Sequence, residues 1–213
     1  MVTYDVINSG SDGNAVVLNG SILIDCGVPY KAVSKYAGNL KQVLLTHTHC
    51  DHFTPSTIRR LAADRPTLRF GGGRWMIEPL LMAGVRKMNI DILDADHAYK
   101  FGFGTVIPFK LSHNVPNQGY KLHLPGGRVI YATDTGTLAG ITAKDYDLYL
   151  VEADYEDEDI QERIRQKQKA GEYAYERNVL YNHLSKARCD NWISQNIGPT
   201  GQYIYMHQHR QEG

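Results

Sequence analysis

The sequence predicts a layered α/β or α+β fold in which two β-sheets carry helices on their outer faces. Short apolar runs mark strands in two groups, and each group is followed by segments with helical signals. The chain has 213 residues, 42% hydrophobic and 22% charged, which is typical of a globular protein rather than of a disordered, collagen-like or coiled-coil chain. A chain of this length buries about 70% of its surface on folding. We therefore expect a single domain over residues 1–213.

The first group of strands lies in the N-terminal quarter of the chain. Four strands are expected from their apolar residues and from the turns between them: Val2–Ile7, Ala15–Leu18, Ile22–Ile24 and Gln42–Thr46. Thr54 followed by Pro55 is typical of a helix start, with Thr54 as the N-cap and a helix through about Ala63. The segment Arg74–Met82 predicts a second helix, which Gly84 ends.

The second group follows the same order, strands first and helices afterwards. Between Met88 and Tyr131 short apolar runs alternate with Gly and Pro turns, and Tyr146–Glu152 is a further apolar strand. Two helices and a last strand are expected beyond it: Glu156–Tyr175, Cys189–Ile197 and Gln202–Met206.

Charge and cysteine content exclude several classes of protein. The chain has 23 Lys and Arg against 23 Asp and Glu. It is therefore not a protein that coats nucleic acid through its net charge alone. No apolar run approaches the roughly 20 residues that span a bilayer, and the N-terminal residues lack the basic and apolar regions of a secretion signal. Three cysteines without a repeated spacing predict a reducing compartment and a cytoplasmic protein with no membrane partner.

The chemistry of the chain is concentrated directly after the strand Gln42–Thr46. The sequence there reads His47-Thr48-His49-Cys50-Asp51-His52. In extended chain His47 and His49 point to the same side and can bind one metal ion, whereas Asp51 and His52 lie where the chain turns and can face a second. Buried His and Asp side chains are costly without partners, so we interpret the motif as a metal site rather than a polar turn.

This HxHxDH motif resembles the signature of the metallo-β-lactamase-fold hydrolases. Residues 8–14 are similar to the Ser/Gly-rich loop of the YycJ/WalJ-like branch, and residues 182–185 resemble an element shared in looser form with ribonuclease Z. The resemblance covers nearly the whole chain. It implies a four-layer αββα sandwich and a binuclear metal-dependent hydrolase that uses a metal-bound hydroxide as nucleophile.

The resemblance also implies a role for each site residue. The first metal is expected on His47, His49 and His113, and the second on Asp51, His52 and His207, with Asp134 bridging the two. Asp25 and Glu152 are expected to orient these ligands. His183 is expected to contact a scissile phosphate and to protonate the leaving group, so the catalytic set is Asp51, Asp134 and His183.

Several of these residues have a structural interpretation as well. Asp25 could cap the end of a strand, Asp134 could form an Asx turn, and His183 could be an ordinary buried histidine. His209 competes with His207 for the last ligand position, and we favour His207 because it ends the strand Gln202–Met206. The chain also departs from its relatives at three places: Asp154-Tyr155, Asn182 and Gln208-His209.

The expected cofactor is a pair of divalent ions. Two such ions about 3.5–4 Å apart can share a water molecule and lower its pKa to near 7. Imidazole and carboxylate donors suit Zn²⁺, and Mn²⁺ or Fe²⁺ would fit the same ligands.

The leading substrate class is a phosphodiester. Nucleic acid is a possible partner, because the segment Glu156–Tyr175 contains basic residues and tyrosines that could hold a phosphate backbone and stack bases, although its acidic residues also fit a solvated helix. The alternative substrates are thioesters, lactones or other small esters of the glyoxalase II or lactonase kind. A metal-bound, non-catalytic binding protein is the second alternative.

Overall fold

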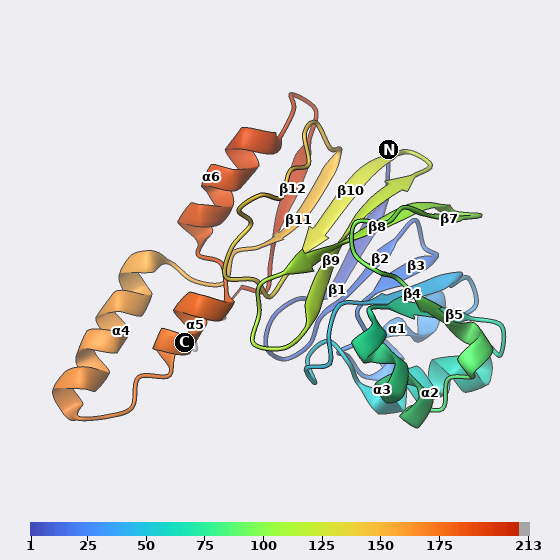
Figure 1. Cartoon of the computed structure of the whole chain (residues 1–213), viewed down its shortest axis with the longest axis horizontal. Coiled ribbons are helices and arrows are strands. Elements are labelled where there is room, and N and C mark those ends of the chain that lie inside the picture. Colours follow the sequence, from blue (N-terminus) through green and yellow to red (C-terminus); the bar gives the residue numbers. More distant parts are fainter. Residues whose placement is uncertain (209–213) are drawn as a thin grey trace.

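A computed structural model describes residues 1–208, and within them two six-stranded sheets pack face to face with helices outside (Figure 1). The N-terminal sheet contains, in spatial order, β1 (Tyr4–Asn8), β2 (Ala15–Leu18), β3 (Ile22–Ile24), β4 (Gln42–Leu45), β5 (Arg69–Gly72) and β6 (Ile90–Ile92). Pairing is antiparallel from β1 to β3 and parallel from β3 to β6. The carboxyl ends of the parallel strands therefore meet at one edge.

The second sheet repeats this mixed arrangement. Its order is β12 (Gln202–Met206), β11 (Leu148–Glu152), β10 (Gly127–Ala132), β9 (Asn117–Leu124), β8 (Gly104–Leu111) and β7 (Tyr99–Phe101). Strands β7 to β10 pair antiparallel, and β10, β11 and β12 are parallel. In both sheets, polar side chains follow directly after the carboxyl ends of parallel strands.

Helices cover the outer face of each sheet (Figure 1). The N-terminal sheet is covered by α1 (Tyr30–Ala37), α2 (Pro55–Asp64) and α3 (Ile77–Met82), and the second sheet by α6 (Lys186–Asn196). Two short 3₁₀ turns, η1 (Arg74–Met76) and η2 (Lys87–Asn89), flank α3. The helices α4 (Asp157–Ala170) and α5 (Glu176–Asn182) project from the sandwich as a separate pair.

Burial of apolar side chains holds the layers together. Between the sheets, Ile24, Leu44, Tyr120, Tyr131 and Leu150 belong to one buried cluster. A second cluster joins the N-terminal sheet to α1–α3, and a third joins the other sheet to α6. Side chains such as these each gain about 1.5–3 kcal/mol from full burial. The predicted two-sheet architecture with outer helices is therefore confirmed.

Some predicted helix boundaries are wrong. Gly171 adopts a left-handed conformation with φ of 72° and ends α4, so the expected helix Glu156–Tyr175 is two helices, α4 and α5, with a break between them. The C-terminal helix begins at Lys186 rather than Cys189, because the Ser185 side chain caps it by accepting a hydrogen bond from the backbone N–H of Arg188. Thr54 precedes α2 as expected, but its side chain makes no capping hydrogen bond.

Candidate metal centre

Residues 47–52, called here the histidine loop, follow β4 at the edge where the parallel strands end. Gly27, in the loop after β3, packs against this segment. A Cβ atom at Gly27 would lie 1.7 Å from the backbone oxygen of Asp51, so only glycine allows the two loops to approach so closely. Backbone hydrogen bonds from Asn14 N to Asp51 O and from Cys26 N to His52 O fix the loop further. Backbone contacts therefore hold the C-terminal end of the loop, at Asp51 and His52.

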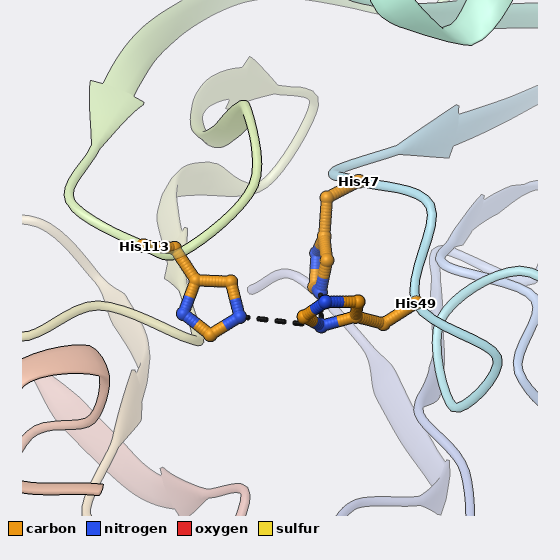
Figure 2. A group of neighbouring side chains, drawn as sticks. All are labelled: His47, His49 and His113. Atoms are coloured by element: carbon orange, nitrogen blue, oxygen red, sulfur yellow. Dashed lines mark hydrogen bonds between the residues drawn. The ribbon is translucent and has the colours of Figure 1, made fainter. Parts of the chain in front are cut away.

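The first donor group consists of His47, His49 and His113, whose rings point toward one another (Figure 2). His47 Nε2 lies 3.1 Å and His113 Nε2 lies 3.3 Å from His49 Nδ1. His113 comes from the loop between β8 and β9, and its Nδ1 lies 3.1 Å from the carbonyl oxygen of Asn182, which orients the ring. Burial lowers the pKa of His47 to about 2 and that of His113 to about 4, so both rings are neutral at pH 7 and offer lone pairs.

The second donor group is made of Asp51, His52, Asp134 and His207. His207 Nε2 lies 3.3 Å from Asp51 Oδ2 and 3.5 Å from Asp134 Oδ1, while His52 Nε2 lies 2.9 Å from Asp134 Oδ2. Burial opposes protonation of His52 and His207, but the facing carboxylates, Asp134 foremost, outweigh it and raise both pKa values well above the usual range. In the metal-free chain the positive charges of protonated His52 and His207 thus balance the negative charges of these carboxylates.

Asp134 lies between the two donor groups. Besides its contact with His52, its Oδ1 lies 3.9 Å from His113 Nε2 of the first group. The residue follows β10 and has a left-handed backbone with φ of 58°, and Asn117 Nδ2 donates to its carbonyl oxygen at 2.8 Å. Asp25 and His207 also have positive φ, at 57° and 51°. Strained backbone of this kind is typical of functional sites.

Asp25 contacts the second group through the ring of His52. Its buried carboxylate accepts hydrogen bonds from the Thr46 backbone N–H and hydroxyl, both at 2.9 Å, and from the Tyr131 hydroxyl at 3.1 Å. His52 Nδ1 lies 2.7 Å from Asp25 Oδ2. This contact fixes the ring so that Nε2 faces Asp134, which is the geometry of a carboxylate that orients a metal-binding histidine.

Glu152 and His183 form a third group beside the other two, together with Asp134 and His207. His183 Nδ1 lies 2.6 Å from Glu152 Oε1, and the backbone N–H of Thr135 donates to Glu152 Oε2 at 2.7 Å. Burial raises the pKa of Glu152 to about 7. Burial disfavours protonated His183, but Glu152 outweighs it and raises the pKa of His183. The His183 ring also stacks on His207, with centroids 5.2 Å apart.

The donor sets fit divalent ions. Nitrogen and oxygen atoms of three to four residues converge within 4.8 Å in each group, and such mixed sets suit Zn²⁺. Although His52 lies nearby, Asp134 Oδ2 makes no hydrogen bond to any part of residues 1–208, and the same holds for His207 Nδ1. A buried carboxylate oxygen without a hydrogen bond is rare in folded proteins and fits an atom that serves a cation.

The structure brings together all the residues that the sequence places in the site, and it adds others. Asn14 Nδ2 lies 2.9 Å from His52 Nε2 and 3.3 Å from Asp51 Oδ2, and Ser9 Oγ accepts from the backbone N–H of His207 at 2.6 Å. Both belong to the Ser/Gly-rich loop of residues 8–14, whose resemblance to the YycJ/WalJ-like branch is the signal that could have marked them. The competing histidine, His209, lies outside the described residues.

The comparisons with known proteins agree with this geometry. The family description "Beta-lactamase superfamily domain" matches residues 21–177, which is more than half of the chain. The metallo-beta-lactamase fold protein YhfI from Bacillus subtilis is similar, with a TM-score of 0.74 and 18% identity over 100% of this chain and 88% of that one. The short form of human tRNase Z has a TM-score of 0.73 and 15% identity, covering 99% of this chain and 93% of its own.

A third solved structure, a diphosphatase of the PhnP family, has a TM-score of 0.68 and 14% identity over 98% of this chain and 88% of that one. No curated protein sequence is similar enough to this chain to count as a match. The fold is thus the metallo-β-lactamase fold, with two mixed sheets between helices. As the sequence predicts, the chain belongs to the beta-lactamase superfamily, a family of hydrolases.

Proposed function

We propose that the chain is a binuclear metal-dependent hydrolase. The first ion is assigned to His47, His49 and His113, and the second to Asp51, His52 and His207. The observation that carries this proposal is the place of Asp134, whose carboxylate lies 2.9 Å from His52 in one donor group and 3.9 Å from His113 in the other. A single carboxylate within reach of two metal-binding groups is suited to bridge two ions.

Zinc is the proposed metal, because the two groups together offer imidazole nitrogens and carboxylate oxygens, and Mn²⁺ or Fe²⁺ would fit the same donors. When bound, two such ions polarise the substrate and lower the pKa of a water molecule to near 7. The carboxylates of Asp51 and Asp134 would hold the ions in place. Asp25 would keep His52 oriented toward the second ion through Nδ1, and Asn14 would keep Asp51 oriented.

His183 is proposed as the general acid. Its Nδ1 contacts Glu152 at 2.6 Å, so Nε2 is the nitrogen left to face a substrate. Because Glu152 favours the protonated ring, His183 can carry a proton at neutral pH and deliver it to a leaving oxygen. Glu152 would act through His183 as a positioning residue.

The proposed substrate is a phosphodiester. Two proteins of similar fold are a tRNase Z and a diphosphatase, and His183 lies where a protonated imidazole could contact a phosphate. Nucleic acid receives little support from α4, because Arg165 pairs with Glu162 and Lys167 pairs with Glu176. A cytoplasmic location is also proposed, because all three cysteines are free. No helix within residues 1–208 is long and apolar enough to cross a membrane.

A hydrolysis panel tests this proposal. The zinc-loaded chain would be assayed with bis(p-nitrophenyl) phosphate, single-stranded DNA, a thioester and a lactone. We expect turnover of the phosphodiesters above that of the other two. Preferential thioester or lactone hydrolysis would indicate a small-ester hydrolase, and no turnover of any substrate by metal-loaded protein would indicate a binding protein.

A further inference from the structure

Asp154 lies beside the metal centre, and none of the roles assigned above uses it. It follows β11, two residues after Glu152. Its backbone N–H donates to the carbonyl oxygen of Leu184 at 2.9 Å, which fixes this segment against the residue that follows His183. The Asp154 side chain is only 9% exposed, so its carboxylate belongs to the interior of the site.

The carboxylates of Asp154 and Glu152 face the same nitrogen of His207. Asp154 Oδ1 lies 3.6 Å and Glu152 Oε1 lies 3.8 Å from His207 Nδ1. The other ring nitrogen, Nε2, faces Asp51 and Asp134 of the second donor group. His207 therefore turns one nitrogen toward the metal-binding carboxylates and the other toward the segment after β11.

The nitrogen that faces this segment lacks a hydrogen bond. His207 Nδ1 is buried and has no hydrogen-bond partner within residues 1–208. A neutral imidazole that binds a metal through Nε2 carries its proton on Nδ1. Metal-binding histidines almost always donate that proton to a carboxylate, a carbonyl oxygen or a water molecule. His207 therefore requires an acceptor on its Nδ1 side.

Glu152 is poorly placed to be that acceptor, because both of its oxygens already have partners. Oε1 contacts His183 Nδ1 at 2.6 Å, and Oε2 accepts from the backbone N–H of Thr135 at 2.7 Å. Within residues 1–208, in contrast, the one ion pair of the Asp154 carboxylate is with His207. The rings of His183 and His207 stack nearly in parallel, at 13°, so two neighbouring histidines face two carboxylates and each has one of its own.

We propose that Asp154 is the positioning residue of His207: its carboxylate accepts the hydrogen bond from Nδ1 and holds Nε2 toward the second ion. The inference rests on the proposed binuclear function. At 3.6 Å the contact is longer than a hydrogen bond of about 2.7–3.2 Å, and a small rotation of the side chains closes it. Asp25 has the same relation to His52, at 2.7 Å from Nδ1, so each histidine of the second group has its own orienting carboxylate.

Stepwise zinc binding to the full chain tests this role. Asp154→Ala should weaken affinity for the second ion by roughly 10–100-fold, whereas the first ion should bind as in the wild type. Asp154→Asn should stay near the wild type, because its amide oxygen still accepts a hydrogen bond. Competition with a chelator measures both affinities. The matched control is Glu156→Ala, which removes an exposed carboxylate two residues further on that pairs with Lys186, and it should change neither affinity.

Three outcomes of this titration would overturn the inference, with the fold of each variant verified by circular dichroism. The first is wild-type affinity for both ions in Asp154→Ala. The second is a loss in Asp154→Asn as large as in Asp154→Ala, because the amide retains the acceptor. The third is an equal loss at both ions, which would make Asp154 a purely structural residue.

Nuclear magnetic resonance reads the ring of His207 directly. Nitrogen-15 spectra of the zinc-treated chain should show a slowly exchanging proton on His207 Nδ1, identified by its absence from His207→Gln. Asp154→Asn should retain this signal and Asp154→Ala should lose it. A signal that persists unchanged in Asp154→Ala would overturn the inference even if that variant binds zinc weakly.

The two measurements separate this inference from the proposed function. Two ions in the wild type, with unchanged binding by Asp154→Ala, would retain the binuclear centre and overturn the role of Asp154. Fewer than two ions in the wild type would contradict the binuclear centre. In that case the His207 Nδ1 signal still decides whether Asp154 holds the ring.

Discussion

Asp25 joins the inter-sheet core to the metal centre through one short contact. Its Oδ2 lies 2.7 Å from His52 Nδ1, and Thr46 and Tyr131 hold the carboxylate from other sides. Asp25→Asn should weaken metal affinity by roughly 10–100-fold, the usual cost of losing a group that orients a ligand. Competition with a chelator measures this, with Asp64→Asn, on a surface pair with Arg60, as the control. An unchanged affinity would make Asp25 a purely structural residue.

Asp134 is the carboxylate that is proposed to serve both donor groups. Asp134→Ala removes the only carboxylate among the described residues that lies within 4 Å of a histidine in each metal group. Elemental analysis should then show clearly fewer than two ions per chain, because both sites lose a donor. A variant that retains two ions would show that the two groups bind independently.

His183 separates acid catalysis from metal binding. His183→Ala should keep the metals and lower turnover of a phosphodiester with a poor leaving group by about 10²–10⁴. Activated p-nitrophenyl esters should lose much less, because their leaving group departs without a proton. Equal losses on both substrates would contradict the acid role, and loss of metal from the variant would make His183 a ligand instead.

Metal binding should depend on pH in a defined direction. Burial opposes protonation of His52 and His207, but the nearby carboxylates hold the pKa of each well above its usual range, so both rings are protonated at pH 7 without metal. Ligands must lose their protons to bind a metal, so binding should release protons and affinity should fall as pH decreases. Calorimetry in buffers of different ionisation enthalpy measures the release, and none at pH 7 would contradict the assignment.

At the scale of elements, the histidine loop is positioned by its contact with the loop after β3, which contains Gly27. Gly27→Ala would place a Cβ atom 1.7 Å from the backbone oxygen of Asp51, so the backbone must move. We expect a loss of about 1–3 kcal/mol in the free energy of unfolding, together with weaker metal retention.

Gly38→Ala is the control for that variant. Gly38 ends α1 with φ of −60°, and a Cβ atom added there would have no other atom within 4 Å, so alanine should be neutral or slightly stabilising. Chemical denaturation of both variants provides the comparison. Equal stability would show that the loops can separate without cost.

The elements that sequence analysis missed have physical reasons for being hard to find. Strand β5 reads Arg-Phe-Gly-Gly, which locally favours a turn, and it becomes a strand only by pairing with β4 and β6 on either side. A Cβ atom at Gly71 would lie 2.8 Å from Leu93, so packing explains the glycine. The short α1 has no capping side chain to mark its start. In contrast, β2 and β4 are apolar enough along their length to be predicted from sequence.

At the scale of the whole molecule, the site combines residues from Asn14 to His207. The histidine loop could be predicted because its ligands are adjacent in sequence, and Asp134 and His207 because they end strands within a resemblance to a known family. The contacts of Asn14 and Asp154 could not be predicted from sequence, since they depend on how the two sheets pack. The single domain over residues 1–213 and the individual ligand roles stay predictions.

The number of metal ions per chain tests the central claim most directly. The purified chain would be reconstituted with excess Zn²⁺, freed of unbound metal by gel filtration and measured by elemental analysis. The account predicts about two ions per chain, because the carboxylate of Asp134 is proposed to serve both converging donor groups. One ion or none would contradict the binuclear centre on which the proposed hydrolase rests.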